Sequence, residues 1–596
     1  MTAQFRSTLL WLLACTIALS FLLLHMPSVM VNGEFIPYGG DSFYHARRIL
    51  ETIADPAGGF WEFDHRSYAP KGTWHVWPWL FDWGLAHITR AIMWFGGIGD
   101  PLAVLTYVPV LFVCINLGLL MGAAGLLGLP LWMRGLAGFA FAMSPLTLVL
   151  HMPGRIDHHF IEMTCVLATL YLGLNWLQRP TAIWVAPALG FVLGVAPGLQ
   201  NGLFILQLPV LSALFVIWAR RMERPQRPSV NRFTVALGLS TIAILLPSET
   251  FWDGQFFFYT LTGFHLLIAA CTIFVAQFMT RRNPTPHNLV LLTVLGLLIL
   301  VLLTPHLRAG TDFVSGENPT YKSIAEMANL FVFAQTKGLA ETAQTYSLLL
   351  LTLPVTLLIT LTWPFKSPAP ERIFFALMVW GGAVLLLLSY RMSYFGSFAL
   401  YLAPLMAIRV AIERKRRFTW VLGTFLALGY AGANVSAYPL LTRPTPIGGT
   451  FTYAWNRSIF PVLEEYCARN PGIVLAPPEV GHFITFHTTC SVLSNLMVLT
   501  PQQTEGVNLT KRLLFGVPPE SVPSSHPEIK YVLVYGSISP AMNPGETPER
   551  TLPSNLFLQL LHGGKDSPHF EPLEQIDVVI GLRAATHAIK LFGVKH

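Results

Sequence analysis

The sequence predicts a polytopic α-helical membrane protein with about 13 transmembrane helices and a C-terminal α/β domain in water. Of the 596 residues, 53% are hydrophobic and only 12% are charged, whereas soluble proteins carry about 25% charged residues. Apolar runs long enough to cross a bilayer, about 20 residues each, recur almost as far as residue 435. Beyond residue 441 the chain has mixed charge, short apolar runs and frequent Pro and Gly, which are typical of a folded aqueous domain.

The first apolar run is predicted to be a transmembrane helix and not a signal peptide, because it lacks a small-residue cleavage site and many more spans follow. We therefore divide the chain into a membrane-embedded catalytic domain, residues 1–440, and an external mixed α/β domain, residues 441–596. The expected spans are residues 9–30, 102–128, 133–151, 160–177, 181–198, 201–219, 233–248, 257–279, 287–304, 345–363, 373–389, 396–411 and 418–436.

The positions of Lys and Arg predict the orientation. Basic clusters such as residues 220–227, 281–282 and 409–417 all follow even-numbered spans, so the positive-inside rule places the N-terminus in the cytoplasm. The C-terminal domain is then external, in the periplasm if the membrane is a bacterial inner membrane. The same scatter argues against nucleic acid as a partner, although the net charge is +7, because the basic residues do not form one patch.

Two outward loops, residues 31–101 and 305–344, are too long to be simple connections. Ionisable groups gather in the outward loops next to span ends, where carboxylates and imidazoles are costly unless they are paired or bound to a metal. Together they would bind a divalent cation, while an arginine could hold a phosphate through two hydrogen bonds. The candidate residues are Asp41, Asp157, His159 and Glu326 for the metal and Arg391 for the phosphate.

Each of these motifs is weak when taken alone. A single loop Asp is more often a turn former or a helix cap than a ligand, and Arg391 could be an interfacial anchor. All of these motifs are predicted to lie on the same side of the membrane, which favours a shared function. That function would be metal-assisted transfer from a phosphate-bearing lipid on the outer face.

Four short motifs resemble those of the oligosaccharyltransferase catalytic-subunit family, which includes the bacterial and archaeal single-subunit enzymes. Asp41-Ser-Phe-Tyr-His-Ala-Arg47 resembles the Asp motif of the family's first loop, and Gly154-Arg-Ile-Asp157-His-His159 resembles its second acidic motif. Ser323-Ile-Ala-Glu326 is similar to the Ser/Thr-x-x-Glu motif of the fifth external loop. Arg391 matches the family's arginine near the end of the eleventh span.

The resemblance implies a C-type glycosyltransferase fold and a metal-dependent transfer of a glycan from a polyprenyl-(pyro)phosphate carrier to an acceptor, usually a protein. Asp41, Asp157 and Glu326 would be the catalytic residues, and with His159 they would hold Mn²⁺ or Mg²⁺. Arg391 would bind the donor phosphates. The expected partners are a polyprenyl-linked glycan donor, a protein or other acceptor, and the lipid bilayer.

The aqueous domain departs from the family. The family's Trp-Trp-Asp-Tyr-Gly motif reads the hydroxyl of the acceptor sequence Asn-x-Ser/Thr, but here Pro477-Pro478-Glu479-Val480-Gly481 stands in its place. Glu479 and Gly481 remain the candidates for acceptor recognition, and the loss of both indoles predicts a changed acceptor. A lipid or polysaccharide acceptor therefore stays open as an alternative, and a transporter or flippase is a second alternative.

Cys467 and Cys490 are the only cysteines in the aqueous domain. An external compartment permits a disulfide between them, but buried free cysteines are also common, so both possibilities stay open.

Overall fold

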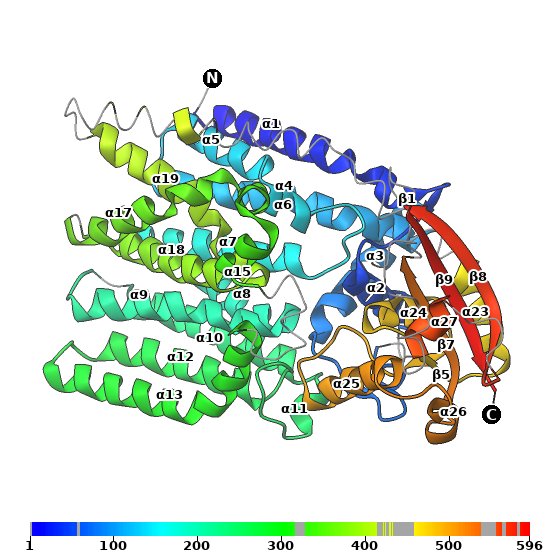
Figure 1. Cartoon of the computed structure of the whole chain (residues 1–596). Helices are drawn as coiled ribbons and strands as arrows, with labels where there is room; N and C mark the ends of the chain where they lie inside the picture. The colour runs from blue at the N-terminus through cyan, green and yellow to red at the C-terminus, as the bar shows by residue number, and fades with distance from the viewer. Residues whose placement is uncertain are drawn as a thin grey trace.

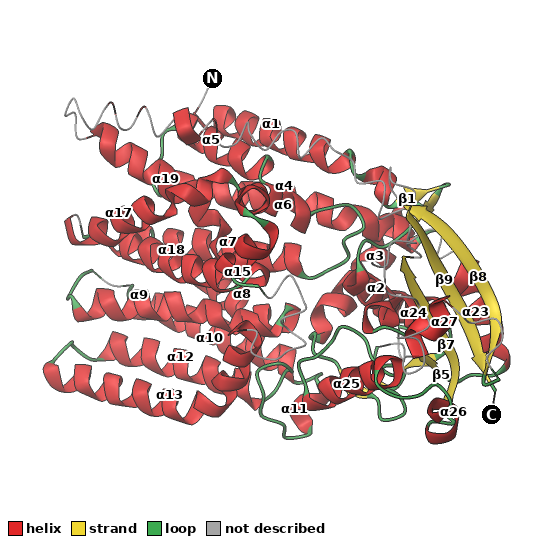
Figure 2. Ribbon diagram, viewed as in Figure 1, coloured by secondary structure: helices red, strands yellow, loops and turns green. Residues whose placement is uncertain are grey.

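The computed structural model describes residues 3–56, 60–223, 225–315, 328–366, 368–413, 421, 424, 428–430, 432, 458–537, 556–562, 568–580 and 585–595. Long helices lie side by side in one part of the molecule, and a twisted sheet with its own helices covers one end of them (Figure 1). Figure 2 shows that the strands are concentrated at this end, while the rest is almost entirely helical.

The helical part contains the long apolar elements of the chain. Its helices are α1 Ala3–Leu23, α4 Pro101–Leu126, α5 Leu131–Ala142, α6 Pro145–Leu150, α7 His159–Gln178, α8 Val185–Leu199, η2 Asn201–Leu206, α9 Gln207–Ala219, α10 Arg227–Leu245, α11 Glu249–Trp252, α12 Gly263–Arg281, α13 Pro286–Ser315, α15 Leu330–Lys337, α16 Leu339–Tyr346, η4 Leu348–Thr352, α17 Leu353–Lys366, α18 Pro370–Leu388, η5 Tyr390–Met392 and α19 Ser393–Glu413.

Within the described residues, nine helices are long and apolar enough to cross a membrane. Two shorter apolar helices, Val185–Leu199 and Leu348–Trp363, match two further expected spans. The expected span 133–151 is divided into α5 and α6, because Pro145 starts α6 and the residue before a proline avoids helical geometry. The expected span 418–436 lies mostly outside the described residues. The prediction of a polytopic helical membrane protein is confirmed.

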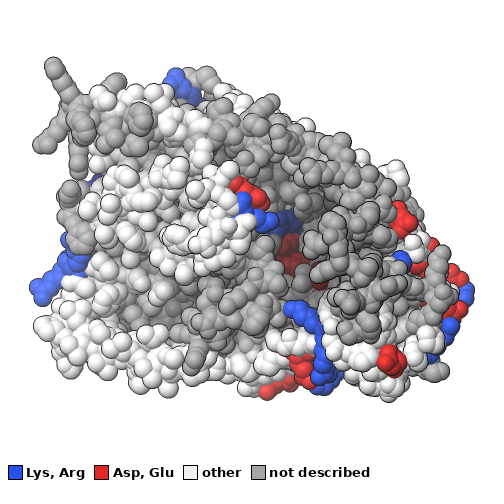
Figure 3. All heavy atoms as spheres, viewed as in Figure 1, with Lys and Arg blue, Asp and Glu red and all other residues white. Residues whose placement is uncertain are grey.

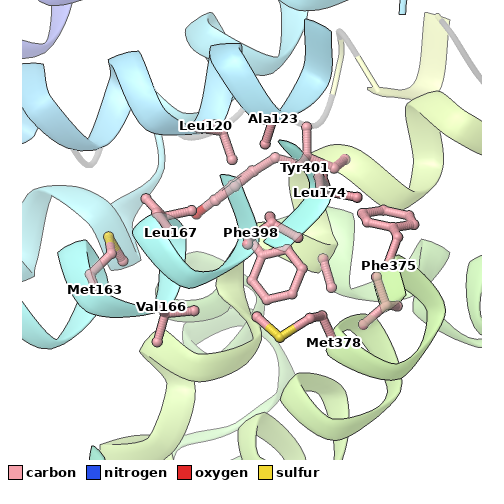
Figure 4. Packing of buried hydrophobic residues seen from close by; sticks show 14 of the residues in the cluster. Leu120, Ala123, Met163, Val166, Leu167, Leu174, Phe375, Met378, Phe398 and Tyr401 are labelled. Atoms are coloured by element: carbon pink, nitrogen blue, oxygen red, sulfur yellow. The ribbon is translucent and has the colours of Figure 1, made fainter. Parts of the chain in front are cut away.

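The helices pack closely around α7, α18 and α19. Figure 4 shows Val166 and Leu167 of α7 on the side of Phe398 and Met378, and Leu174 of α7 beside Phe375 of α18. Small residues allow the closest approach elsewhere: a Cβ on Gly190 of α8 would lie 2.2 Å from the carbonyl oxygen of Phe233 in α10. Such contacts hold membrane helices together, because burial in lipid offers them little hydrophobic gain.

The C-terminal part is a mixed five-stranded sheet in the order β6-β5-β7-β9-β8. β5 pairs in parallel with β6 and β7, whereas β9 pairs antiparallel with β7 and β8. The predicted α/β domain, with strands near 473–476 and 531–535, is therefore present. Its elements are α23 Phe460–Arg469, β5 Ile473–Leu475, η7 Pro478–Val480, α24 Gly481–His487, β6 Ser491–Val492, α25 Pro501–Phe515, α26 Ser521–Ser525, β7 Ile529–Ser537, α27 Leu556–His562, β8 Phe570–Ile580 and β9 Ala585–Val594.

A disulfide joins Cys467 of α23 to Cys490, which lies just before β6, with the two Cα atoms 5.3 Å apart. The possibility of a bond between these two cysteines is confirmed.

The segment between α1 and α4 attaches the sheet domain to the helices. Its elements are η1 Met26–Ser28, β1 Met30–Val31, β2 Glu34–Phe35, α2 Gly40–Ala54, β3 Phe63–Asp64, β4 Thr73–Trp74 and α3 Trp79–Gly96. The Tyr68 hydroxyl donates to the side-chain oxygen of Asn495 at 2.7 Å, and the Arg66 guanidinium donates to the Cys490 carbonyl at 3.1 Å. These contacts fasten the stretch between β3 and β4 to the sheet domain, and α2 packs against α24.

Candidate functional site

A cavity of about 370 Å³ lies at the seam between the helical part and the sheet domain. It collects three predicted site residues, Asp41, Asp157 and Arg391, from segments far apart in the sequence. Figure 3 shows acidic and basic groups in a hollow at this seam, whereas the surface of the helical part is mostly uncharged. The lining consists of residues 38–42, Val76, Trp77, Arg155, Asp157, Arg391 and residues 496–499.

Asp41 lies in the first turn of α2, where a carboxylate is favoured by the unpaired backbone N–H groups of the helix. The Asp41 side chain is one-quarter exposed and lines the cavity. The Nε2 atom of His482, from α24 of the sheet domain, lies 3.9 Å from Asp41 Oδ1. Asp41 is thus reachable from the cavity and lies against the C-terminal domain.

Asp157 is 5% exposed and is surrounded by basic groups. His159 Nε2 lies 3.4 Å and the Arg155 guanidinium 3.9 Å from Oδ2, while His158 Nδ1 lies 2.9 Å from Oδ1. Burial would raise the pKa of the Asp157 carboxyl, but His159, His158 and Arg155 outweigh burial and hold that pKa well below its usual range. Asp157 is therefore a carboxylate prepared for a cation or another positive group.

His159 is oriented by Glu162, one turn further along α7. Its Nδ1 atom lies 2.6 Å from Glu162 Oε2, and the Tyr394 hydroxyl donates to the other Glu162 oxygen at 2.9 Å. The two ring nitrogens of His159 thus face two carboxylates, Glu162 at Nδ1 and Asp157 at Nε2, and Glu162 fixes the orientation of the ring. Glu162 is not among the predicted site residues, and the signal in the sequence that points to its orienting role is the i, i+3 spacing to His159.

A buried layer lies behind this motif. His45 Nδ1 pairs with Asp82 Oδ1 at 2.7 Å, and Arg48 pairs with the second Asp82 oxygen at 2.7 Å. Burial would raise the pKa of Asp82, but the charges of His45 and Arg48 lower it below its usual value. His45 and Asp82 are not among the predicted site residues, because no sequence spacing connects α2 to α3.

Of the remaining predicted ligands, Glu326 lies outside the described residues, as does the rest of its Ser323-Ile-Ala-Glu326 motif. Arg391 lies in η5, at the start of the segment that continues as α19, and lines the cavity with Asp41 and Asp157. The structure thus brings together Asp41, Asp157 and Arg391, with His159 beside Asp157.

Glu479 and Gly481 are not among the described residues that line this cavity. Glu479 is exposed and accepts a hydrogen bond from the Tyr535 hydroxyl at 2.9 Å. Burial and the Glu479 charge both raise the Tyr535 pKa. The sheet domain instead lines the cavity with residues 496–499, which are Leu, Met, Val and Leu.

His482 of α24 lies next to Asp41. Its side chain is fully buried, and within the described part of the chain neither ring nitrogen has a hydrogen-bond partner. Burial lowers the His482 pKa to about 3, so its imidazole is neutral at ordinary pH. His482 thus places a neutral imidazole of the sheet domain next to the Asp41 carboxylate. Only the tertiary structure reveals this contact.

A second cavity, of about 400 Å³ and mostly apolar, lies within the helical part. It is formed by side chains of α7, η2, α9, α18 and α19, including Val166, Trp380 and Phe395. Phe395 is four residues after Arg391, so the two cavities meet the same segment of the chain. This arrangement suits a molecule with a charged head and a long apolar tail.

The structure assigns Gly481 a packing role. A Cβ there would lie 2.3 Å from the Ser494 carbonyl oxygen and 2.9 Å from the Asn495 Cβ. We expect Gly481→Ala to destabilise the sheet domain by about 2 kcal/mol, because backbone atoms cannot move aside as a flexible side chain can. Hydrogen exchange of the β5 and β7 amides in the full chain measures this loss.

The matched control for that measurement is Gly593→Ala in β9, where the nearest atoms to a new Cβ lie at an ordinary 3.6 Å. Unchanged exchange in Gly481→Ala would mean that the helix start can shift, and would contradict the packing role.

The donor set fits a divalent cation. Asp157 offers a carboxylate, His159 offers an oriented imidazole nitrogen, and Asp41 lines the same cavity. Groups formed by His158, His159 and Glu162, and by His45, Asp157 and His158, have potential ligand atoms within 4.8 Å of one another. Oxygen donors with imidazole suit Mg²⁺, Mn²⁺ or Zn²⁺ depending on how many nitrogens bind.

The fold, a helical membrane part with a C-terminal sheet domain, is similar to that of solved membrane glycosyltransferases. In particular, the chain is similar to the oligosaccharyltransferase AglB from the archaeon Archaeoglobus fulgidus in complex with an inhibitory peptide and a dolichol-phosphate. The TM-score is 0.77 at 16% identity, over 96% of this chain and 80% of that chain.

Two further solved structures have related folds. The A. fulgidus enzyme in complex with Zn and sulfate gives a TM-score of 0.68 at 16% identity, over 95% of this chain and 79% of that chain. The mycobacterial arabinofuranosyltransferase AftD gives 0.51 at 13% identity, over 100% of this chain and 42% of that chain. No protein-family profile and no curated protein sequence matches the chain. The predicted fold class is confirmed.

Proposed function

We propose that this protein transfers a glycan from a polyprenyl-linked phosphate or pyrophosphate to an acceptor at the outer face of the membrane. The observation that supports it most is the meeting of Asp41, Asp157 and Arg391 in one cavity, between a membrane-spanning helical part and a sheet domain. The fold shared with AglB, which was solved with a dolichol-phosphate and a peptide, supports the same reaction type.

The donor occupies both cavities in this proposal. Arg391 binds the phosphate through its planar guanidinium, which matches phosphate oxygens in a two-pronged geometry. The apolar cavity formed by α7, α9, α18 and α19 receives the start of the polyprenyl chain. Phe395 lines this cavity and follows Arg391, which lines the polar cavity, by four residues in the sequence. A transporter would instead place its charged groups near the middle of the bilayer.

Asp41, Asp157, His159 and Glu326 would hold a divalent cation, Mn²⁺ or Mg²⁺, and the bound cation would supply positive charge next to the donor phosphate. Asp41 accepts a hydrogen bond from the attacking group of the acceptor. That group forms a bond to the anomeric carbon as the bond from this carbon to the phosphate oxygen breaks, and its proton passes to the Asp41 carboxylate. Arg391 stabilises the negative charge that the leaving phosphate gains.

The acceptor is proposed to differ from the usual Asn-x-Ser/Thr sequence, with a protein as the favoured class. Reading a hydroxyl requires polar groups that stay unpaired without it. Pro477 and Pro478 offer no side-chain donor, and Glu479 already accepts from Tyr535. The apolar wall of residues 496–499 favours an acceptor recognised by apolar contact, which keeps a lipid or polysaccharide acceptor as the second candidate.

The proposed site belongs on the external side. The basic clusters of the sequence predict a cytoplasmic N-terminus, and Figure 3 shows basic groups at the end of the helical part opposite the sheet domain. The protein would thus be a multi-pass protein of the inner or plasma membrane with its sheet domain outside, in the periplasm.

The acceptor prediction is tested with the purified full chain, a lipid-linked glycan and paired peptides that contain Asn-Ala-Thr or Asn-Ala-Ala. We expect the two peptides to react equally or not at all, because the stretch Pro477-Pro478-Glu479 is not expected to bind the threonine hydroxyl. Gel mobility and mass spectrometry of the peptides measure transfer. A strong preference for the Thr peptide would contradict the proposal and restore ordinary Asn-linked glycosylation.

A further inference from the structure

The two carboxylate oxygens of Asp157 face different imidazoles. Oδ2 lies 3.4 Å from Nε2 of His159, the residue expected at the catalytic cation. Oδ1 lies 2.9 Å from Nδ1 of His158 and 4.0 Å from Nε2 of His45, and these two nitrogens are 3.3 Å apart. Asp157 Oδ1, His158 Nδ1 and His45 Nε2 therefore form a compact triangle.

The triangle has the dimensions of a metal site. In a tetrahedral Zn²⁺ site with bonds of ~2.0 Å, neighbouring ligand atoms lie roughly 3.3 Å apart. The observed edges of 2.9, 3.3 and 4.0 Å lie on both sides of this value. All three side chains are at least 95% buried, so the cost of leaving them without a cation or a proton at the centre is high.

In both histidines, the ring nitrogen that points away from the triangle faces a carboxylate. His45 Nδ1 is 2.7 Å from Asp82 Oδ1, and Asp82 is itself held by Arg48 at 2.7 Å. His158 Nε2 is 3.6 Å from Glu162 Oε1. Histidines that ligate a metal usually have a carboxylate, a carbonyl or water at their second nitrogen, and this arrangement is met here twice.

Protons on His158 are the other possible occupants of the triangle. An imidazolium would donate from Nδ1 toward Asp157 Oδ1 and from Nε2 toward Glu162, but in the described residues neither Asp157 Oδ1 nor His158 Nε2 has a hydrogen bond of acceptable geometry. A neutral His158 would carry a single proton on Nδ1, within hydrogen-bond distance of His45 Nε2. This neutral form would leave Nε2 of His158 as a bare lone pair facing the Glu162 carboxylate. A cation on Nδ1 moves the proton to Nε2, where it faces Glu162, and neutralises Oδ1 as well.

We propose that His45 Nε2, His158 Nδ1 and Asp157 Oδ1 bind a zinc-class divalent cation, with a fourth position open to water. Two imidazoles and one carboxylate select Zn²⁺ or Co²⁺ over Mg²⁺. This cation is separate from the one proposed for transfer and shares only Asp157 with it. It orients Asp157 from behind and fastens α2 to the start of α7. The site follows from the contacts above and does not depend on the proposed function.

The test uses the purified full chain in detergent, freed of metal with a chelator and titrated with Co²⁺. We expect one tightly held equivalent with the strong visible absorption of four-coordinate Co²⁺, which Zn²⁺ displaces. His45→Gln and His158→Gln should each abolish this absorption. Asp82→Asn should keep it but weaken Co²⁺ binding by about 10- to 100-fold, because only the partner of a ligand is changed.

Two matched controls separate this site from the catalytic one. Asp41→Asn and His482→Gln, at the cavity but outside the triangle, should leave the Co²⁺ absorption unchanged. Loss of the absorption in Asp41→Asn with retention in His45→Gln would place the cation at Asp41 and overturn the proposal. Absence of any retained Co²⁺ in the unmutated chain would leave a proton in the triangle and would overturn it too.

A measurement without variants covers the case in which a substitution prevents folding. X-ray absorption of the unmutated chain with one equivalent of Zn²⁺ should show two imidazole ligands. One imidazole, which is the number in the set Asp41, Asp157, His159 and Glu326, would overturn the proposal, as would none.

Discussion

The Asp41→Asn variant is expected to lose more than about 100-fold of its glycan transfer rate while remaining folded. Asn keeps the size of the side chain but removes the charge that faces the cavity, and a neutral amide is a poor substitute at a divalent cation. The side chain is one-quarter exposed, so the change leaves no buried charge unpaired. Transfer is measured with a lipid-linked glycan and whichever acceptor the unmutated chain glycosylates.

The control for this measurement is Asp253→Asn, on an exposed Asp directly after α11. Transfer by Asp253→Asn should equal that of the unmutated chain. Equal transfer by Asp41→Asn would remove Asp41 from the catalytic machinery, whatever cation the protein holds.

Replacement of both bridging cysteines, Cys467→Ala with Cys490→Ala, is expected to cost the sheet domain roughly 3 kcal/mol. The disulfide closes a loop with a sequence separation of 23 residues, and in the chain-entropy model such a loop stabilises the folded state by about that amount. The bridge also anchors Cys490, and the carbonyls of Thr488 and Cys490 accept hydrogen bonds from Arg66, which lies between β3 and β4. Chemical unfolding followed by hydrogen exchange at β5 and β6 measures the effect.

A thiol reductant provides the internal control. It should lower the stability of the unmutated chain to the level of the double variant and leave the double variant unchanged. Equal stability of the unmutated chain and the double variant would show that the bridge does not stabilise this domain.

The sequence alone predicted the architecture, because bilayer-spanning helices need long apolar runs and the aqueous domain does not contain them. Twelve of the expected spans correspond to described helices or helix pairs, and the thirteenth, residues 418–436, falls mostly outside them. The break at Pro145 was missed since an apolar run continues through it, and hydropathy does not register a change of backbone direction.

The sequence also selected Asp41, Asp157 and Arg391, because charged groups next to apolar spans are rare and need partners. Their meeting in one cavity depends on the tertiary structure, since the three lie on α2, before α7 and in η5. The acceptor residues stay a prediction. Glu479 and Gly481 were chosen by alignment of a motif, but a side chain's surroundings depend on the whole fold, and the structure pairs Glu479 with Tyr535 and packs Gly481 against Ser494.

Only the tertiary structure decided which imidazoles surround Asp157 and Asp41. His158 and His159 are adjacent in the sequence, yet His159 faces one oxygen of Asp157 and His158 the other. His45 reaches the same carboxylate from α2, and His482 reaches Asp41 from the sheet domain. Sequence spacing reports neighbours along one helix, whereas these contacts join elements separated by more than a hundred residues, and packing alone sets their distances.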